Sequence, residues 1–371
     1  MPIYMDRHNL PQVTAKDVAE AHAKDLQIQD QYGCRALTYW FDERRRTAFC
    51  LVEAPDEASV EAMHNHAHGL VPHQIIEVNP HLVESFLGRV TDPEIAKADN
   101  SSGLPAIQES AFRTLMLVTL KGAAVVLEKC NDANANKVIN IATNQLRITT
   151  GRFDGTGVEH TGSCFLFSFV SPTKAITSAV EVQKSIAMHD ISANALQLQI
   201  VLNAGMPVTK NKDLFGEALK VAKRLSVAAN DGNILVTSSV KDWCRDEGLS
   251  LSKSRLPVKV ISATDETFLN RLIAFMEQQY HHSELNIRLL TKAMHTSKSQ
   301  LYRKMVSLTS LAPNDFIKEF RLQQALHLME KGERHIAEVA YATGFTSSSY
   351  FSKCFQKRFG VLPSHYAILV A

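Results

Sequence analysis

The C-terminal part of the chain contains the same arrangement of short capped helices twice. Asn286 and Ser297 can cap the two helices of the first copy, while Gly344 ends one helix and Ser347 starts the next in the second copy. Gly344 suits a left-handed turn residue, which a side chain would penalise. Apolar residues recur at helical spacing in all of these segments: Ile287, Leu290 and Met294; Leu301 and Met305; Ile336, Val339 and Ala340; Phe351, Phe355 and Phe359. Each copy therefore predicts a helix-turn-helix unit.

A single helix is expected to join the two units. Pro313 fits its first turn, and its apolar residues are Phe316, Ile317, Phe320, Leu322, Ala325, Leu326 and Leu328. A rigid helix of roughly 18 residues spans about 27 Å. Two recognition helices at that separation can enter successive faces of the major groove, which recur about every 34 Å. The pattern predicts a protein that reads duplex DNA.

This segment resembles the AraC/XylS family of transcription regulators over about residues 266–368. The phrases "SKSQLYRKM" and "IAEVAYATGFTSSSYFSKCFQKRFGVLPSHY" carry the resemblance. One departure is Ser310, where the family usually has glycine in the loop before Pro313. The resemblance implies an all-α DNA-binding domain with two helix-turn-helix units over residues 266–371.

The early turns of each recognition helix are expected to reach base edges. By position in the motif, the candidate base contacts are Ser299, Tyr302, Arg303, Ser348, Ser349, Ser352 and Lys353. Arg303 is the best candidate for a bidentate contact with guanine. The serine-rich second helix carries less intrinsic specificity. Candidate phosphate contacts are Lys298, Lys304, Lys357 and Arg358. Each of these side chains could instead be an ordinary solvated residue, and Tyr350 and Phe351 are expected in the core.

Composition is that of an ordinary globular protein, with 371 residues, 45% hydrophobic and 21% charged. The net charge of +2 does not by itself indicate a polyanion partner, but from Asp265 onward about 13 Lys and Arg stand against 9 Asp and Glu. No apolar run approaches the roughly 18 residues of a membrane span, and no secretion signal is visible. A cytoplasmic protein without membrane contact is expected. The six cysteines include no Cys-x-x-Cys pair, and we expect them to be reduced thiols.

Two polar stretches divide the chain into three expected domains. Residues 89–108 contain Pro, Gly and paired Ser, and residues 262–266 form a shorter polar joint. The expected domains are 1–88, 109–261 and 266–371, which makes the protein multidomain α+β.

The N-terminal segment is expected to form a strand at 2–8, a helix at 14–32, two strands at 34–41 and 46–53, a helix at 56–68 and a strand at 73–79. This order is the ferredoxin-like plan, whose open sheets commonly pair face to face in dimers. The phrases "MDRH", "AHAKDLQIQDQYGCRALTYWFDE", "FCLVEAPD" and "HGLVPHQIIEV" resemble a small ferredoxin-like family with a nickel-binding member. Nickel or another transition metal is the cofactor that this resemblance implies.

Histidines are frequent in this segment. His64 and His68 lie four residues apart on an expected helix and can face one metal, whereas His66 points elsewhere. His8 ends the first strand and could meet His22 on the following helix. Gathering all four of these histidines in one subunit is awkward, because the two helices are expected to place them at opposite ends of the sheet. The alternatives are a metal or ligand site, which a dimer interface could complete, and surface histidines at a helix end.

The middle segment is expected to be an α/β domain. Its strands are expected at 111–120, 196–204 and 233–237, with a hairpin around 155–169. Its helices are expected from after Gly122 to about 145, over 171–188 and near 216–229. Together with "GVEHTGSCFLFSF", "AITSAVEVQKSI", "LQIVLNAGMPV" and "DLFGEALKVAKRLSVAANDGNILVTSSV", this order resembles the class III nucleotide cyclase homology domain.

The residues for cyclase chemistry are missing from the positions that the resemblance implies. Alignment on Gly122 and on Thr161-Gly162 puts Thr119 and Ser163 where the family has two metal-binding aspartates. Lys220 replaces the family's asparagine, although Arg224 is kept. No catalytic residue and no cyclase activity are therefore expected. Lys220 and Arg224 lie one helical turn apart and could bind an anionic ligand, or they could form a solvated basic helix face.

The sequence thus predicts a ligand-responsive, sequence-specific transcription regulator that acts as a homodimer. Its N-terminal domains would sense a small-molecule or metal effector. The expected partners are double-stranded DNA and RNA polymerase. Two alternatives remain open: a nucleotide cyclase fused to a DNA-binding domain, and a metal-binding or storage protein with a DNA-binding output.

Overall fold

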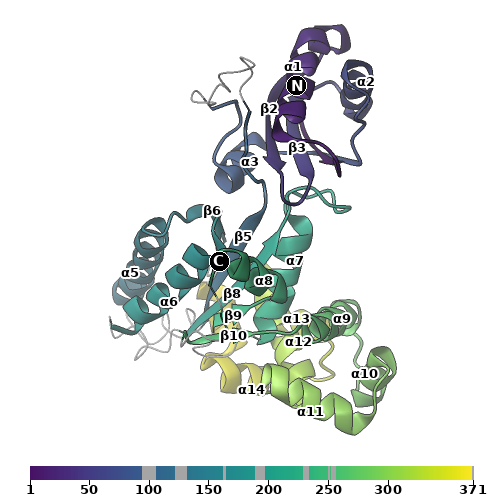
Figure 1. Cartoon of the computed structure of the whole chain (residues 1–371). Helices are drawn as coiled ribbons and strands as arrows, with labels where there is room; N and C mark the ends of the chain where they lie inside the picture. The colour runs from purple at the N-terminus through teal and green to yellow at the C-terminus, as the bar shows by residue number, and fades with distance from the viewer. Residues whose placement is uncertain are drawn as a thin grey trace.

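A computed structural model gives the structure of the chain. It describes residues 1–93, 106–121, 132–161, 164–188, 197–228, 234–249, 251 and 256–369. Figure 1 shows an N-terminal sheet with two helices at the top, a larger mixed sheet in the middle and a group of helices at the bottom.

The N-terminal unit has the ferredoxin-like fold that the sequence predicts. Its four-stranded antiparallel sheet has the order β2-β3-β1-β4, so that β1 lies inside the sheet. Thr14 begins the first helix with a capping box, and the Asp56 side chain accepts from the backbone N–H of Ser59 at the start of the second. The elements are β1 (Ile3–Asn9), α1 (Ala15–Ile28), β2 (Arg35–Asp42), β3 (Thr47–Glu53), α2 (Glu57–Ala67) and β4 (Gln74–Glu77).

The open face of this sheet is covered within the chain. Met5, Trp40 and Leu51 on that face are completely buried. They belong to one apolar cluster with α3 (Pro80–Leu87) and with the middle unit. This face is therefore not free to pair with a second subunit as open ferredoxin-like sheets commonly do, because the chain's own residues occupy it.

The segment 89–108 is not a free linker at its described ends. Arg89 donates to the backbone oxygen of Tyr39 over 2.6 Å, and its guanidinium lies 4.4 Å from the Trp40 ring centroid. At the other end, the Ile107 N–H donates to the Tyr39 hydroxyl over 2.9 Å. Both ends thus pack on the N-terminal sheet, and residues 94–105 lie outside the described part.

The middle unit is a six-stranded mixed sheet with the order β10-β9-β8-β5-β7-β6. The strand β5 is antiparallel to both of its neighbours, whereas β8, β9 and β10 run parallel. The strands are β5 (Arg113–Lys121), β6 (Thr156–Thr161), β7 (Cys164–Phe169), β8 (Gln197–Gly205), β9 (Ile234–Val236) and β10 (Val258–Val260).

Helices cover both faces of this sheet, because alternate strand residues are apolar on each side. One face packs on α5 (Asp132–Gly151), α6 (Pro172–Met188) and α8 (Ser238–Asp246). The other packs on α3 and α7 (Gly216–Leu225). The short elements α3, α8 and β10 were not predicted, because their apolar runs are too brief to show a period.

The expected joint at 262–266 is the start of a helix and not an extended linker. Ser262 caps a helix through the backbone N–H of Asp265, and α9 (Ala263–Gln279) runs without a break from there. Leu269 of this helix shares an apolar cluster with the middle unit. The polar residues that suggested a joint are the first turn of α9.

The C-terminal unit contains the two predicted helix-turn-helix units, with Asn286, Ser297 and Ser347 as caps. Gly344 has a φ of +81°, and a Cβ there would lie 2.4 Å from the backbone oxygen of Tyr280. The helices are α10 (Ile287–Met294), α11 (Lys298–Thr309), α12 (Pro313–Glu330), α13 (Ile336–Ala342), α14 (Ser348–Phe359) and α15 (Pro363–Leu369).

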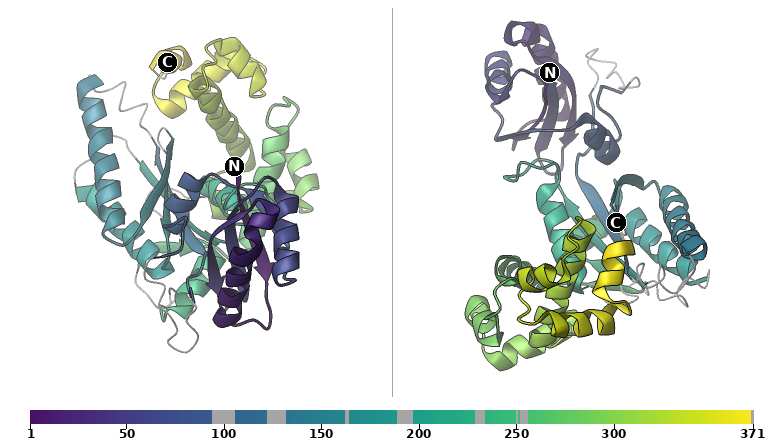
Figure 2. Two further views of the ribbon diagram at one scale, coloured as in Figure 1. Left: turned by 90° about the horizontal axis from the view of Figure 1, so that it is seen from above. Right: turned by 180° about the vertical axis from the view of Figure 1, so that it is seen from behind.

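The connecting helix α12 belongs to two separate apolar clusters. Its first half, with Phe316 and Phe320, packs with α9, α10 and α11. Its second half, with Leu322 and Ala325, packs with α13, α14 and α15. The views in Figure 2 show this group of helices beside the middle sheet, with α5 on the far side. Among the described residues, no helix is both long and apolar enough to cross a membrane.

Candidate functional site

The predicted base contacts lie on the exposed sides of α11 and α14. Ser299 and Arg303 are exposed, and the side chain of Tyr302 is 52% exposed. Ser349 and Lys353 are exposed on α14, whereas Ser348 and Ser352 are half-buried, with the Ser352 hydroxyl donating to the Ser348 backbone oxygen over 2.9 Å. Tyr350 was expected in the core but is 56% exposed beside this surface, whereas Phe351 is fully buried as expected.

The four predicted phosphate contacts divide into two kinds. Lys298 and Lys357 are exposed and form no salt bridge with any described residue. The other two are paired within the chain: the Lys304 Nζ lies 3.1 Å from an Asp265 oxygen, and the Arg358 Nε donates to Glu319 over 2.7 Å. Binding of DNA through Lys304 and Arg358 would compete with these pairs.

A buried group of histidines and carboxylates lies between the N-terminal sheet and its two helices. His64 of α2 is at its centre, and its side chain is 1% exposed. The Nε2 atom of His64 lies 2.9 Å from Asp6 of β1, and its Nδ1 atom lies 3.1 Å from Asp25 of α1. Each of these two carboxylates has a second histidine beside it: the His8 Nε2 is 3.0 Å from Asp6, and the His68 Nε2 is 3.2 Å from Asp25.

Attraction between the carboxylates and the imidazolium rings stabilises the charged forms of these side chains, although burial disfavours them. Burial lowers the pKa of His64, but the carboxylates of Asp6 and Asp25 outweigh it and raise the pKa to about 10. Burial likewise raises the pKa of Asp6, but His8 and His64 hold it well below its usual range. Burial also raises the pKa of the nearby Cys50 thiol well above its ordinary value.

Two sets of donor atoms here are close enough to share a metal ion. Asp6, His8, Cys50 and His64 form one set, and Asp25, His64 and His68 form the other, with the donor atoms of each set within 4.8 Å of one another. Imidazole nitrogen, carboxylate oxygen and thiol sulfur together suit nickel and its neighbours in the first transition series. His64 belongs to both sets through its two ring nitrogens.

His22 lies beside the same group. It lines a cavity of ≈ 20 Å³ together with His8, Asp25, Cys50 and His68, and its Nε2 atom lies 3.3 Å from Asp92. The four histidines that the sequence made awkward to gather in one subunit thus lie in one region of the N-terminal unit, although His22 belongs to neither set of donor atoms. The two helices lie side by side on one face of the sheet, so their inner faces meet over β1.

Sequence reasoning missed the carboxylates and the thiol of this group. Asp6 lies two residues before His8 on a strand, so both side chains point to the same face. Asp25 lies three residues after His22 on α1, which also places the two on one helix face. Cys50 lies opposite Asp6 across the sheet, and its backbone N–H donates to Asp6 over 3.1 Å. His66 points away, as expected, and lies 2.7 Å from the Tyr32 hydroxyl.

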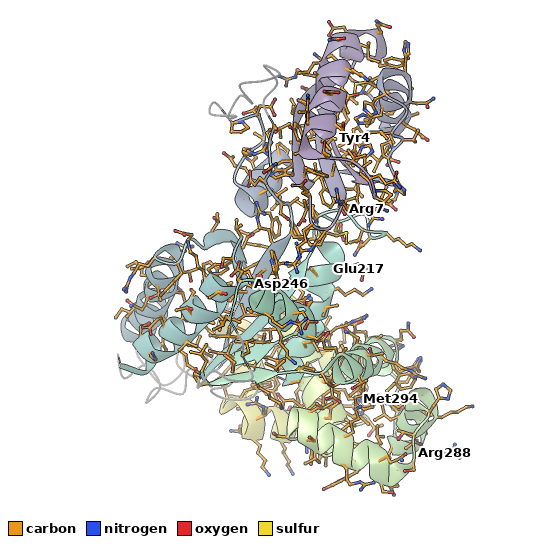
Figure 3. The ribbon with its side chains drawn as sticks, in the orientation of Figure 1. Tyr4, Arg7, Glu217, Asp246, Arg288 and Met294 are labelled. Carbon is orange, nitrogen blue, oxygen red and sulfur yellow. The ribbon has the colours of Figure 1, made fainter. Side chains whose placement is uncertain are left out.

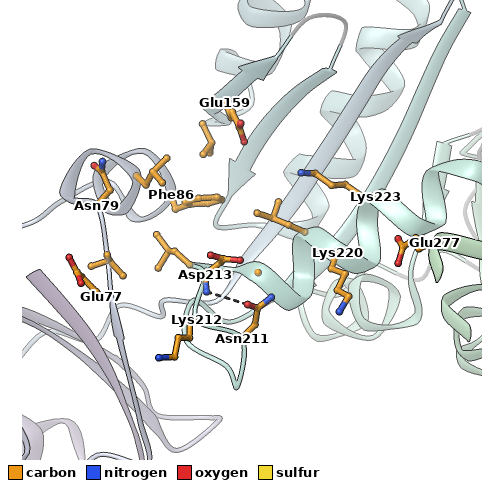
Figure 4. Close-up of a pocket in the computed structure, with 16 residues that line it drawn as sticks. Glu77, Asn79, Phe86, Glu159, Asn211, Lys212, Asp213, Lys220, Lys223 and Glu277 are labelled. Carbon is orange, nitrogen blue, oxygen red and sulfur yellow. Dashed lines mark hydrogen bonds between the residues drawn. The ribbon is translucent and has the colours of Figure 1, made fainter. Parts of the chain in front are cut away.

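The structure does not bring Lys220 and Arg224 to one pocket. Lys220 lines a cavity of ≈ 530 Å³ between α3 and α7, which Figure 4 shows. Arg224 lines a second cavity, of ≈ 790 Å³, and is paired with Glu277 of α9 over 2.7 Å. Lys223, between them, lines both cavities. Thr119 also lines the second cavity, whereas Gly122 and Ser163 lie outside the described residues.

Comparison with known proteins assigns both ends of the chain. Residues 290–367 match the family model described as a helix-turn-helix domain, and residues 4–78 match that of the nickel responsive protein SCO4226-like family. The C-terminal part is thus an AraC-type helix-turn-helix DNA-binding domain, and the N-terminal part is an SCO4226-like domain.

Individual relatives match the C-terminal part. The transcriptional regulator MtrA of Neisseria gonorrhoeae is 35% identical over 83 residues, which are 22% of this chain and 28% of MtrA. The transcriptional activator RhaS of Escherichia coli is 30% identical over 115 residues, which are 31% of this chain and 40% of RhaS. The chain spans 8% to 40% of the length of the curated relatives that it matches first.

The middle unit is similar to a solved adenylyl cyclase. The structure of CyaB from P. aeruginosa is 16% identical and superposes with a TM-score of 0.32. The match covers 36% of this chain and 81% of that structure.

Proposed function

We propose that this protein is a sequence-specific transcription regulator that senses a transition metal through its N-terminal domain. The observation that carries the proposal is the buried histidine-carboxylate group on β1, in the same chain as two exposed recognition helices. The group supplies the sensing site, and α11 and α14 supply the DNA contacts.

The metal would be bound by Asp6, His8, Cys50 and His64, or by Asp25, His64 and His68. In the first set it would join β1, β3 and α2, and in the second it would join α1 to the C-terminal end of α2, where His68 is the cap residue. Metal binding would replace one of the present hydrogen bonds of His64 with a metal–nitrogen bond, which is shorter than a hydrogen bond. Nickel is the first candidate, because the N-terminal part is an SCO4226-like domain.

Arg7 gives this site a direct connection to the middle unit. It lies between Asp6 and His8 on β1, so its side chain points to the opposite face of the strand. Its Nη1 atom donates to the Met206 sulfur and to the Val208 backbone oxygen, both over 3.3 Å. Those two residues precede α7, which packs on α9 of the DNA-binding unit. In Figure 3, Arg7 lies at the junction of the N-terminal and middle units.

A homodimer and contact with RNA polymerase complete the proposal. A dimer would present four helix-turn-helix units and would occupy a longer operator. Since the open face of the N-terminal sheet is covered, the dimer must use another surface. Sedimentation of the protein alone and with duplex DNA would show its oligomeric state.

We infer that the middle unit is not an active cyclase. Thr119 offers a hydroxyl where a hard divalent ion needs an anionic oxygen. Incubation with Mg²⁺ or Mn²⁺ and ATP or GTP should give no cyclic product. Turnover that disappears in Thr119→Ala would make the protein a cyclase fused to a DNA-binding domain.

The DNA-binding part of the proposal can be tested without knowing the operator. The full-length protein would select duplexes from a random pool, and the enriched sequences would be read. We expect a motif with two parts centred about 10 base pairs apart, because two recognition helices then face the same side of the duplex. Absence of any enriched motif would contradict sequence-specific binding.

The metal part is tested by calorimetric titration with Ni²⁺. Wild-type protein and His66→Ala should bind with equal affinity, since His66 is on the same helix but outside the group. His64→Ala should lose most of the binding. Tight binding that leaves DNA affinity unchanged would instead favour metal storage.

A further inference from the structure

A second large cavity lies between the middle unit and the DNA-binding unit. The cavity of ≈ 790 Å³ is large enough for a small organic molecule, since such pockets typically have about 300–1,000 Å³. It is walled by α7 and η3 (Ser226–Ala228) on one side and by α9, α12 and α14 on the other. None of its residues belongs to the histidine-carboxylate group of the N-terminal domain.

Part of the cavity lining is apolar. Phe316 and Phe320 lie one turn apart on α12, with ring centroids 6.5 Å from each other. Ile273 of α9 and Val227 of η3 extend this surface. Both side chains are largely buried, 3% and 8% exposed, so an apolar ligand body would contact only the part of each ring that reaches the cavity.

The polar part of the lining carries one positive charge in excess. Arg224 is paired with Glu277, and Arg358 is paired with Glu319, so these four side chains balance one another. Lys223 adds one positive charge, and it forms no salt bridge in the part of the chain that the structure describes. Thr119, Gln323 and Gln324 supply uncharged hydrogen-bonding groups around it.

The walls also include the turn between α11 and α12. Ser310 lines the cavity with a φ of +59°, in the left-handed region where a side chain is penalised. The cavity therefore touches the first helix-turn-helix unit, the connecting helix and, through Arg358, the second unit.

We propose that this cavity binds an amphipathic organic anion, with a flat apolar body on Phe316 and Phe320 and its acidic group near Lys223. A ligand here would contact α7 and α12 at once. It would thereby stabilise one placement of the two helix-turn-helix units relative to the middle sheet. This site is separate from the proposed metal sensor and does not depend on it.

The test uses 8-anilinonaphthalene-1-sulfonate, a fluorescent aromatic sulfonate, titrated into the full-length protein. Wild-type protein should bind one equivalent saturably. Gln324→Trp should fill the cavity and weaken binding at least tenfold, and Lys223→Gln should weaken it about tenfold. Lys220→Gln is the matched control, because Lys220 is on the same helix but lines only the neighbouring cavity of Figure 4.

The folding of each variant would be checked by its thermal unfolding midpoint. Unsaturable binding, or binding that Gln324→Trp leaves unchanged, would overturn the proposed site. Loss of binding in Gln324→Trp with no effect of Lys223→Gln would overturn its preference for anions. Because no DNA or metal is present, these results are independent of the regulator proposal.

Discussion

At the scale of single residues, the structure separates exposed groups that can reach a ligand from buried groups that stabilise the fold. Arg303 belongs to the first kind and is exposed on α11. Arg113 belongs to the second, with a side chain that is 2% exposed. Both are arginines, yet their substitution should have opposite consequences for DNA binding and stability.

Arg303→Ala should weaken DNA binding by about 1–3 kcal/mol and relax preference at one base position, as loss of a bidentate guanine contact does. The measurement is fluorescence anisotropy with the selected duplex and its single-base variants. Lys331→Ala, in the turn after α12, is the control and should bind as wild type does. Unchanged affinity and base preference in Arg303→Ala would remove this residue from the contact set.

Arg113→Met should destabilise the protein by about 3 kcal/mol, because it removes the donor of several hydrogen bonds to buried backbone oxygens. The guanidinium donates to the backbone oxygens of Phe86, Leu87 and Ser110, at the end of α3 and the start of β5. Urea unfolding measures this cost. Arg35→Ala, an exposed partner of Glu53, should change stability by less than about 1 kcal/mol, and an equally small effect of Arg113→Met would contradict the role assigned to it.

At the scale of elements, helix ends were the most predictable features. Asn286, Ser297 and Ser347 cap the helices that the sequence assigned to them, because a cap depends on its own side chain and the next three residues. The histidine-carboxylate group was only half predictable. Its members come from β1, α1, β3 and α2, and only the packing of two helices on one sheet face brings them together.

Gly344→Ala should destabilise the second helix-turn-helix unit by about 2–4 kcal/mol, since it combines a strained backbone with a steric clash. Gly332→Ala is a matched control. It also has a positive φ, of +99°, but a Cβ there meets nothing within 4 Å, so it should cost only about 1 kcal/mol. Thermal unfolding of both variants checks the difference, and equal midpoints would refute the clash with Tyr280.

At the scale of the whole molecule, the units are packed against one another. One apolar cluster contains residues of the N-terminal sheet, α3, the middle sheet, α7 and α9. The sequence predicted the three folds but expected polar joints between them. Such packing could not be predicted, because an apolar residue on a strand or helix does not specify which neighbour will cover it.

Arg7→Ala should uncouple the metal site from the DNA-binding unit while leaving both functions present. Its contacts to Met206 and Val208 join β1 to the segment before α7. Affinities for Ni²⁺ and for the selected duplex should each stay within about twofold of wild type, but their mutual dependence should be lost. A retained dependence would show that the signal passes through other contacts.

The most direct test of the central claim is the operator affinity of the full-length protein with and without saturating Ni²⁺, measured by fluorescence anisotropy at fixed salt. Ni²⁺ should change this affinity by about fivefold or more, and the operator should change the Ni²⁺ affinity by the same factor. His66→Ala should respond as wild type does, and His64→Ala should not respond. Equal operator affinities with and without Ni²⁺ in the wild-type protein would contradict the account.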